Sequence, residues 1–335
     1  MKMKFKLLTL SASLLACGIG VSGQAQANAY AVATNNIKDG YVATFVDGIL
    51  DTSGKYMSFG TPASESSTSA TLNGNGVAHN SVTPPPDSPV STVGSPVRTN
   101  ENVNADGYYN LFGKLGTNYS WGDAKVVSEQ ALTGTPIVAR NAAESNLAGR
   151  GSANGDGTNK SSTVLSIPVV IGGDCGAGHT CQVNFSFLAD PYILAVLDAG
   201  VNPPHVARGT IAMSITLTKV NDLIPTFAWA PNGDCPGGVG TCAGVAGGTE
   251  YADAENLNLT REALVPGQTS EYSAPYANNV YGAYGARTIA LGTGTYTLTL
   301  FMNEKTDVQL PEPATIGLLG LGLLGLGFAR RRKQA

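Results

Sequence analysis

Hydrophobic and polar residues alternate along several segments in the C-terminal half of the chain. Residues 182–188 and 295–301 show this pattern, and residues 210–220 show it over the longest run. One face of these segments gathers apolar side chains: Ile211, Met213, Ile215, Leu217, Tyr296, Leu298 and Leu300. A period of two is typical of an antiparallel strand with one buried face. The pattern therefore predicts antiparallel strands in these three segments.

Other segments are less regular. Residues 30–34 and 41–50 are candidate strands near the start of the chain, and residues 164–171 are rich in β-branched side chains. Pro168 indicates an edge position or a break in the last of these, because proline has no N–H to donate to a sheet. Residues 190–198 (DPYILAVLD) instead predict a short helix or a connecting segment.

The composition agrees with a protein built from strands and turns. The chain has 335 residues, of which 42 are glycine and only 13% are charged. We predict an all-β fold, with residues 28–310 forming a single antiparallel β-sandwich or jelly-roll-like body. Residues 61–100 are rich in Ser, Thr and Pro and predict a long exposed loop. An N-terminal signal helix and a C-terminal hydrophobic helix are expected to lie outside the fold.

Residues 1–27 have the three parts of a secretory signal peptide. Lys2, Lys4 and Lys6 precede an uncharged, mostly apolar stretch, residues 7–20. Ala25 and Ala27 then form an A-x-A cleavage site, so we expect cleavage after Ala27. A lipobox-like sequence ends at Cys17 and leaves lipidation of Cys17 as the alternative.

The last 25 residues predict a membrane segment with a fixed orientation. Residues 314–329 carry no charge and would span roughly 24 Å as a helix, against a hydrocarbon core of about 30 Å. The prolines of the preceding Pro311-Glu312-Pro313 oppose a helix and favour an accessible, extended segment. A basic end follows and should stay on the cytoplasmic side: Arg330, Arg331, Arg332 and Lys333.

This arrangement of triplet, short Gly/Leu-rich span and basic end resembles the PEP-CTERM sorting signal. The resemblance covers about 25 residues. It implies export in a Gram-negative bacterium, a transient stop in the inner membrane and processing by an exosortase, with the secretion machinery as a further partner. The expected destination is the cell surface or the extracellular space. Residues 116–124 and 189–192 also resemble stretches that recur in such proteins, and this looser likeness implies no activity.

The charge of the body disfavours nucleic acid as a partner. Without the seven basic residues of the two ends, and without Glu312, the body keeps 13 basic and 23 acidic residues. Binding to nucleic acid through its phosphates needs a basic patch. We therefore expect an acidic, soluble surface and no nucleic-acid partner.

The four cysteines of the body form two local pairs in similar surroundings. Gly-Asp-Cys precedes a Gly-rich loop and Thr-Cys follows it in both cases. We predict the disulfides Cys175–Cys181 and Cys235–Cys242, as expected for an exported protein, although four cysteines permit three pairings. His179 beside Cys175 and Cys181 is the alternative, a metal site, but zinc sites usually have shorter cysteine spacings. No metal and no cofactor are expected.

Signatures of catalysis are missing from the sequence. It has no G-x-S-x-G, H-E-x-x-H or P-loop motif, and residues 154–159 resemble only a fragment of a calcium loop. Acidic residues are too numerous for a catalytic pair to be recognised without geometry, so four candidates stay unassigned: Asp190, Asp198, Glu250 and Asp253. No catalytic residue is predicted.

The leading hypothesis is a non-enzymatic surface or exopolysaccharide-matrix protein with a structural or adhesive role. The alternative is a carbohydrate-binding module, with exopolysaccharide as the candidate partner and exposed tyrosines as its site. The candidate rings are Tyr108, Tyr109, Tyr272, Tyr276, Tyr281 and Tyr284. A secreted hydrolase is a third hypothesis, which two carboxylates about 5–10 Å apart in a groove would support.

Overall fold

The computed structural model describes most of the region between residues 28 and 310. The described residues are 28–60, 65–81, 89–100, 103–104, 108–128, 136–148, 155–161, 167–171, 175, 178–199, 205–235, 242, 244–273 and 281–310. Within them the chain is all-β and contains no helix, and every strand pairing is antiparallel. The all-β prediction is confirmed. The helices expected in residues 1–27 and 311–335 lie outside the described residues.

Two sheets contain the strands. The main path of the first, called sheet 1, runs in the order β15 (Gly248–Asp253), β18 (Gly282–Thr288), β11 (Cys181–Leu197), β1 (Asn28–Val46), β8 (Ile137–Ala148), β7 (Tyr119–Ser128) and β6 (Val90–Gly94). Two short strands join it, β2 (Ile49–Leu50) on β1 and β17 (Thr269–Ser273) on β11. The long strands β1 and β11 form its centre.

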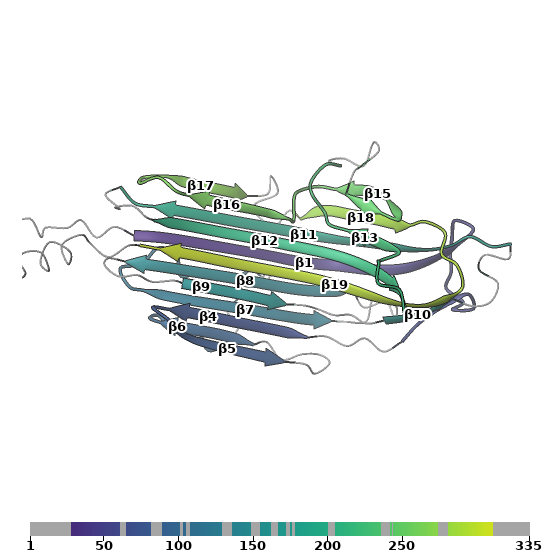
Figure 1. Ribbon diagram of the computed structural model, residues 1–335, viewed down its shortest axis with the longest axis horizontal. Coiled ribbons are helices and arrows are strands. Elements are labelled where there is room, and N and C mark those ends of the chain that lie inside the picture. Colours follow the sequence, from purple (N-terminus) through teal and green to yellow (C-terminus); the bar gives the residue numbers. More distant parts are fainter. Residues whose placement is uncertain are drawn as a thin grey trace, which may run out of the picture.

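The second, called sheet 2, has the order β14 (Val245–Ala246), β13 (Phe227–Trp229), β12 (Val206–Lys219), β19 (Gly294–Gln309), β9 (Gly155–Ser161), β4 (Ser66–Leu72) and β5 (Asn75–Ser81). Three strands pair outside this path: β16 (Leu259–Ala263) on β12, β10 (Ile167–Ile171) on β19, and β3 (Met57–Phe59) on β10. In Figure 1 the strands of both sheets run along the same long axis and overlie one another.

The two sheets pack face to face through their apolar sides. Phe185 of β11 stacks on Phe227 of β13 with ring centroids 5.1 Å apart, and both rings belong to one core cluster. The apolar face predicted for residues 210–220 is buried throughout. Where β12 faces β1, the sheets approach so closely that a Cβ on Gly209 would lie 2.8 Å from the Val32 carbonyl oxygen. This spacing requires glycine at position 209.

The first and last described residues lie at the same end of the body. The N–H of Asn28 donates to Asp198 at 3.3 Å, and a small apolar cluster there contains both Ala29 and Leu310. In Figure 1, β1 starts and β19 ends on the same side of the molecule. Leu310 is only 5% exposed, so the core holds the chain up to the residue before Pro311.

The prediction of a long exposed loop over residues 61–100 is wrong where the structure describes that region. Strands β4, β5 and β6 occupy much of it. Along β4 every second side chain is buried, and the buried Thr68 hydroxyl lies 2.8 Å from the Ser91 hydroxyl of β6. Because Thr68 and Ser91 satisfy their hydroxyl groups with each other across the two sheets, this part of the interface needs few large apolar residues.

The helix or connection predicted for residues 190–198 is also wrong, because β11 continues to Leu197. On one side the strand pairs with β1 throughout, with Pro191 opposite Asn35. On the other side β18 pairs with residues up to Ala189, and β17 pairs from Tyr192 onward. Pro191 lies in the gap between these partners, where a strand needs no N–H donor. In β10, Pro168 lies just before the residues that pair with β3, so it too needs no N–H donor on that side.

Candidate functional site

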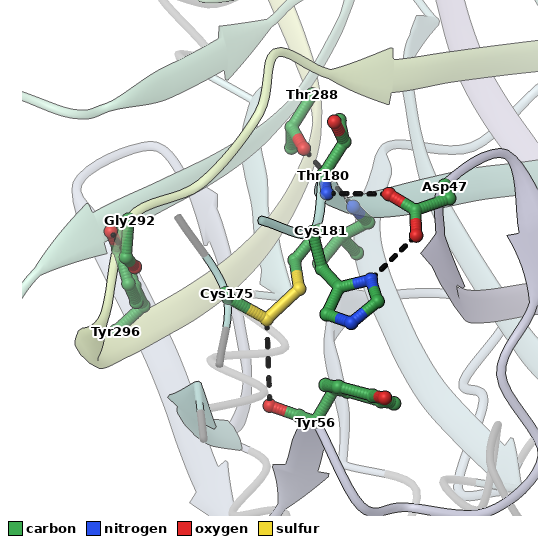
Figure 2. The surroundings of a disulfide bond; sticks show 10 residues. Asp47, Tyr56, Cys175, Thr180, Cys181, Thr288, Gly292 and Tyr296 are labelled. Atoms are coloured by element: carbon green, nitrogen blue, oxygen red, sulfur yellow. Dashed lines mark hydrogen bonds and ion pairs between the residues drawn. A yellow bond between two sulfur atoms is a disulfide. The ribbon is translucent and has the colours of Figure 1, made fainter. Parts of the chain in front are cut away.

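The end of the body opposite Asn28 and Leu310 is clamped by the predicted Cys175–Cys181 disulfide. The structure contains this bond, with Cα atoms 5.6 Å apart and both cysteines buried. Cys181 begins β11, and its carbonyl accepts the N–H of Leu291 at 2.8 Å. Figure 2 shows the Cys175 sulfur near the Tyr56 carbonyl oxygen, at 3.9 Å. The disulfide thus joins segments before β3, before β11 and before β19.

Asp47 forms the main polar contacts of the end that contains the Cys175–Cys181 disulfide. Its carboxylate accepts the N–H of Thr180 at 2.8 Å, as Figure 2 shows, and lies 2.6 Å from Nδ1 of His179. The Thr180 N–H, and then His179, lower the pKa of Asp47 below its ordinary value. Asp47 therefore orients the imidazole ring and fixes the turn that follows β1.

The metal site considered for His179, Cys175 and Cys181 is not formed. The two sulfur atoms are bonded to each other and provide no thiolate ligand. His179 instead contacts Asp47 and the edge of the Tyr56 ring, with ring centroids 5.2 Å apart. The arrangement stabilises loops.

The second predicted disulfide, Cys235–Cys242, is confirmed as well, with Cα atoms 5.4 Å apart. Cys235 is buried, and its carbonyl accepts the N–H of Asp253 at 3.3 Å. The hydrogen bond fastens the turn after β13 to the end of β15, and the disulfide closes the segment between β13 and β14. Local Gly-Asp-Cys and Thr-Cys sequences were sufficient to identify both pairs.

The tyrosines considered for carbohydrate binding do not form one exposed platform. Tyr284 is buried and stacks on Phe187 at 4.9 Å, and Tyr109 is buried against Trp121. Tyr276 lies outside the described residues. Three rings remain half-buried: Tyr108, Tyr272 and Tyr281.

Tyr108 and Tyr281 lie together where β11 has its gap between β17 and β18. Their ring centroids are 5.9 Å apart, and Nζ of Lys38 lies 3.7 Å from the centre of the Tyr281 ring. Asp190 accepts a hydrogen bond from Tyr108, and burial raises the pKa of the Asp190 carboxyl. This group combines two aromatic rings with a cation and a carboxyl group.

A buried carboxylate that the sequence did not reveal lies on the outer side of sheet 1. Glu144 of β8 is fully buried and accepts hydrogen bonds from five donors. These are the Tyr30 and Tyr119 hydroxyls at 2.8 and 3.0 Å, the Trp121 indole at 2.6 Å, and the Phe112 and Gly113 N–H groups at 3.0 and 2.7 Å. Glu144 thereby holds the segment before β7 against the sheet.

Around Glu144 the aromatic residues exclude water. The Arg98 guanidinium lies over the Trp121 ring at 4.0 Å, and burial together with the Glu144 charge raises the pKa of Tyr30. Tyr119, Trp121 and Asp123 come from residues 116–124, so the structure gives that stretch a packing role. No single segment signals this site, because its members come from β1, β7, β8 and the connection between β6 and β7.

The four acidic residues left without a role by the sequence lie in different parts of the body. Asp190 joins the tyrosine group, whereas Asp198 bonds Lys114 near Asn28. Glu250 and Asp253 both belong to β15 and lie close to each other. The structure therefore brings together only the last two.

The residues of the sorting tail lie outside the described part of the chain. This applies to Pro311, Glu312 and Pro313 and to the basic residues 330–333, as it does to Ala25 and Ala27 at the other end. Within the described residues, no helix is long and apolar enough to cross a membrane. The predicted membrane segment, residues 314–329, belongs to the tail.

Comparison with known proteins identifies this tail. Residues 309–333 match the family model of the PEP-CTERM protein-sorting motif. The match begins in the last residue of β19 and covers the predicted triplet, span and basic end. No curated protein and no solved structure matches the chain. The motif implies export, membrane anchoring in transit and processing by an exosortase, so the chain is a PEP-CTERM sorting domain-containing protein.

Proposed function

We propose that this protein is a structural or adhesive component of the cell surface or exopolysaccharide matrix, without enzymatic activity. The observation that carries the proposal is the sorting motif at residues 309–333, which follows β19 without an intervening linker. Two packed antiparallel sheets and two disulfides suit a protein that must persist outside the cell. We further propose that the body is a β-sandwich of jelly-roll-like type.

The position of the two chain ends supports this role. While residues 314–329 hold the protein at the inner membrane, the end that contains Asn28 and Leu310 faces the membrane. The end clamped by Cys175–Cys181 then points away from it. Loops fixed by a disulfide at that end are suited to contact other matrix components.

Processing of the tail gives the first test. Mass spectrometry of the protein released from cells should find a C-terminus upstream of Ala335, because the exosortase removes the hydrophobic span. Replacing Pro311 and Pro313 with alanine should leave the protein in the membrane fraction, since the extended site is lost. A Lys219→Ala variant, changed within the body, serves as the control and should be released. An intact Ala335 on released protein contradicts the proposal.

Carbohydrate binding is the second candidate function, and the pair Tyr108 and Tyr281 favours it. Aromatic rings beside a carboxyl group suit a sugar, which offers both C–H faces and hydroxyl groups. On a glycan array, the protein should bind polysaccharide, and Tyr281→Ala should weaken binding about tenfold or more, a loss of about 1.4 kcal/mol. Tyr41→Ala, at an exposed tyrosine of β1, is the matched control. Equal binding by both variants removes this candidate.

Absence of enzymatic activity needs its own measurement. Incubation of the protein with exopolysaccharide, followed by reducing-end analysis, should detect no cleavage. Turnover would support the hydrolase hypothesis instead.

A further inference from the structure

Three acidic residues meet where the edge of sheet 1 lies beside β13 of sheet 2. Glu250 and Asp253 lie on β15, and Asp234 lies in the turn that follows β13. Glu250 is 6% exposed and Asp253 is fully buried, whereas Asp234 is exposed to solvent. The group is therefore buried on one side and open on the other.

One oxygen of each buried carboxylate is already fixed by the protein. Glu250 Oε1 accepts the indole N–H of Trp229, and Asp253 Oδ2 accepts the N–H groups of Asn232 and Gly233 at 2.8 and 2.7 Å. These bonds hold both carboxylates in one orientation.

The other oxygens, Glu250 Oε2 and Asp253 Oδ1, are buried without a hydrogen-bond donor. Leaving such oxygens unpaired costs free energy, so buried polar groups normally have a partner. The site thus has an excess of buried acceptors that a cation would satisfy.

The spacing of the oxygens fits one cation class. Carboxylate oxygens of Asp234 and Glu250 lie within 4.8 Å of each other. Calcium binds oxygen at 2.3–2.6 Å, so one ion can contact both. The neighbouring sulfur of Cys242 belongs to a disulfide and supplies no thiolate. Oxygen donors alone suit a hard cation such as Ca²⁺ and not zinc.

The backbone around the site is fixed before any ion binds. Gly233 has φ +79°, and a Cβ there would lie 2.7 Å from the N atom of Asn256. The Cys235–Cys242 disulfide fixes the same turn from the other side. A preorganised set of ligands loses little freedom on binding.

We propose that Asp234 and Glu250 bind a calcium ion beside Asp253, with water completing its coordination. The ion couples the turn after β13 to β15 and so joins the edges of the two sheets. Calcium outside the cell would then tighten this edge of the body. The site is distinct from residues 154–159, and it does not depend on the proposed matrix role.

The test uses the full chain, purified in detergent and freed of metal with a chelator that is then removed. Calorimetric titration with CaCl₂ should show one saturable site, and calcium should raise the midpoint of thermal unfolding. Asp234→Asn and Glu250→Gln should each lower calcium affinity at least tenfold. Asp307→Asn, at an acid of β19 near Leu310 and away from the site, is the control and should bind as the parent chain does.

The unfolding temperature with and without calcium distinguishes a calcium site from a pair of carboxyl groups that only stabilises the fold. Without calcium, Glu250→Gln should unfold at a higher temperature than the parent chain, because the amide avoids the cost of burying an ionisable carboxyl group. With calcium the order should reverse, because only the parent chain gains from binding. No saturable binding by the parent chain, or binding unchanged by both substitutions, overturns the proposal.

Discussion

Replacing Glu144 with alanine should lower the free energy of unfolding by roughly 3–5 kcal/mol, a large share of the stability of a typical domain. The substitution removes the shared acceptor of five donors, among them the Tyr30 hydroxyl and the Trp121 indole. Of the five, the Tyr119 hydroxyl keeps the Gly113 carbonyl as an acceptor. An unsatisfied buried donor costs about 1–3 kcal/mol. Urea unfolding followed by tryptophan fluorescence measures the loss.

The matched control is Glu262→Ala. Glu262 is also a strand glutamate, but it pairs with Arg208 at 2.5 Å on the surface. Exposed ion pairs contribute about 1 kcal/mol or less. If both variants unfold at the same urea concentration, Glu144 is not the anchor that its contacts indicate.

Glu304→Gln should have the opposite effect to Glu144→Ala and stabilise the protein at neutral pH. Glu304 of β19 is fully buried between the sheets, and burial raises its pKa well above the ordinary value of 4.5, although the Asn141 amide opposes this. The folded protein therefore holds Glu304 neutral, whereas the unfolded chain ionises it near pH 4.5. Glutamine keeps the shape of the side chain and removes the ionisation.

The pH dependence identifies the cause. A group with a raised folded pKa contributes its full stability below the unfolded pKa and loses it as pH rises toward the folded value. The advantage of glutamine should thus be small at pH 4 and grow by about 1.4 kcal/mol per pH unit above 4.5, until the folded pKa is reached. Unfolding in urea at pH 4, 6 and 8 tests this. A difference that is the same at all three values contradicts it.

The surroundings of Glu304 contain polar groups on the facing strands. Asn141 of β8 and Asn35 of β1 form a register pair across sheet 1, and both are fully buried. The Asn35 amide has no hydrogen-bond partner among the described residues, and the Asn141 amide is the polar group that faces the Glu304 carboxyl. Among the neighbours of Glu304 in sheet 2, Ile211 of β12 lies opposite and carries no charge. A charged Glu304 is therefore poorly compensated.

Features encoded over a short stretch could be predicted from the sequence. The apolar face of residues 210–220 follows from a period of two, and each disulfide joins cysteines within one loop. The sorting motif is local as well. In these cases neighbours in the sequence are also partners in the structure.

Features that depend on distant segments could not be predicted. Strand β4 has few large apolar residues and is recognisable only once the Ser91 hydroxyl lies against Thr68. Glu144 gains its donors from strands and connections up to 114 residues away. Glu250 and Asp253 are near neighbours in sequence, but Asp234 joins them only through the pairing of Asp253 with Cys235.

Leu310 follows β19 directly and is buried in the core, and this has a mechanical consequence. A pulling force on the tail enters β19 directly at Leu310, because that residue is buried beside Ala29 and Leu197. If the opposite end is held, the force runs along the axis of β19, whose register with β12 extends from Val206 to Lys219. The hydrogen bonds between these strands are then loaded in shear, all together, and do not open one after another. The body should resist tension between its two ends far better than tension applied across the sheets.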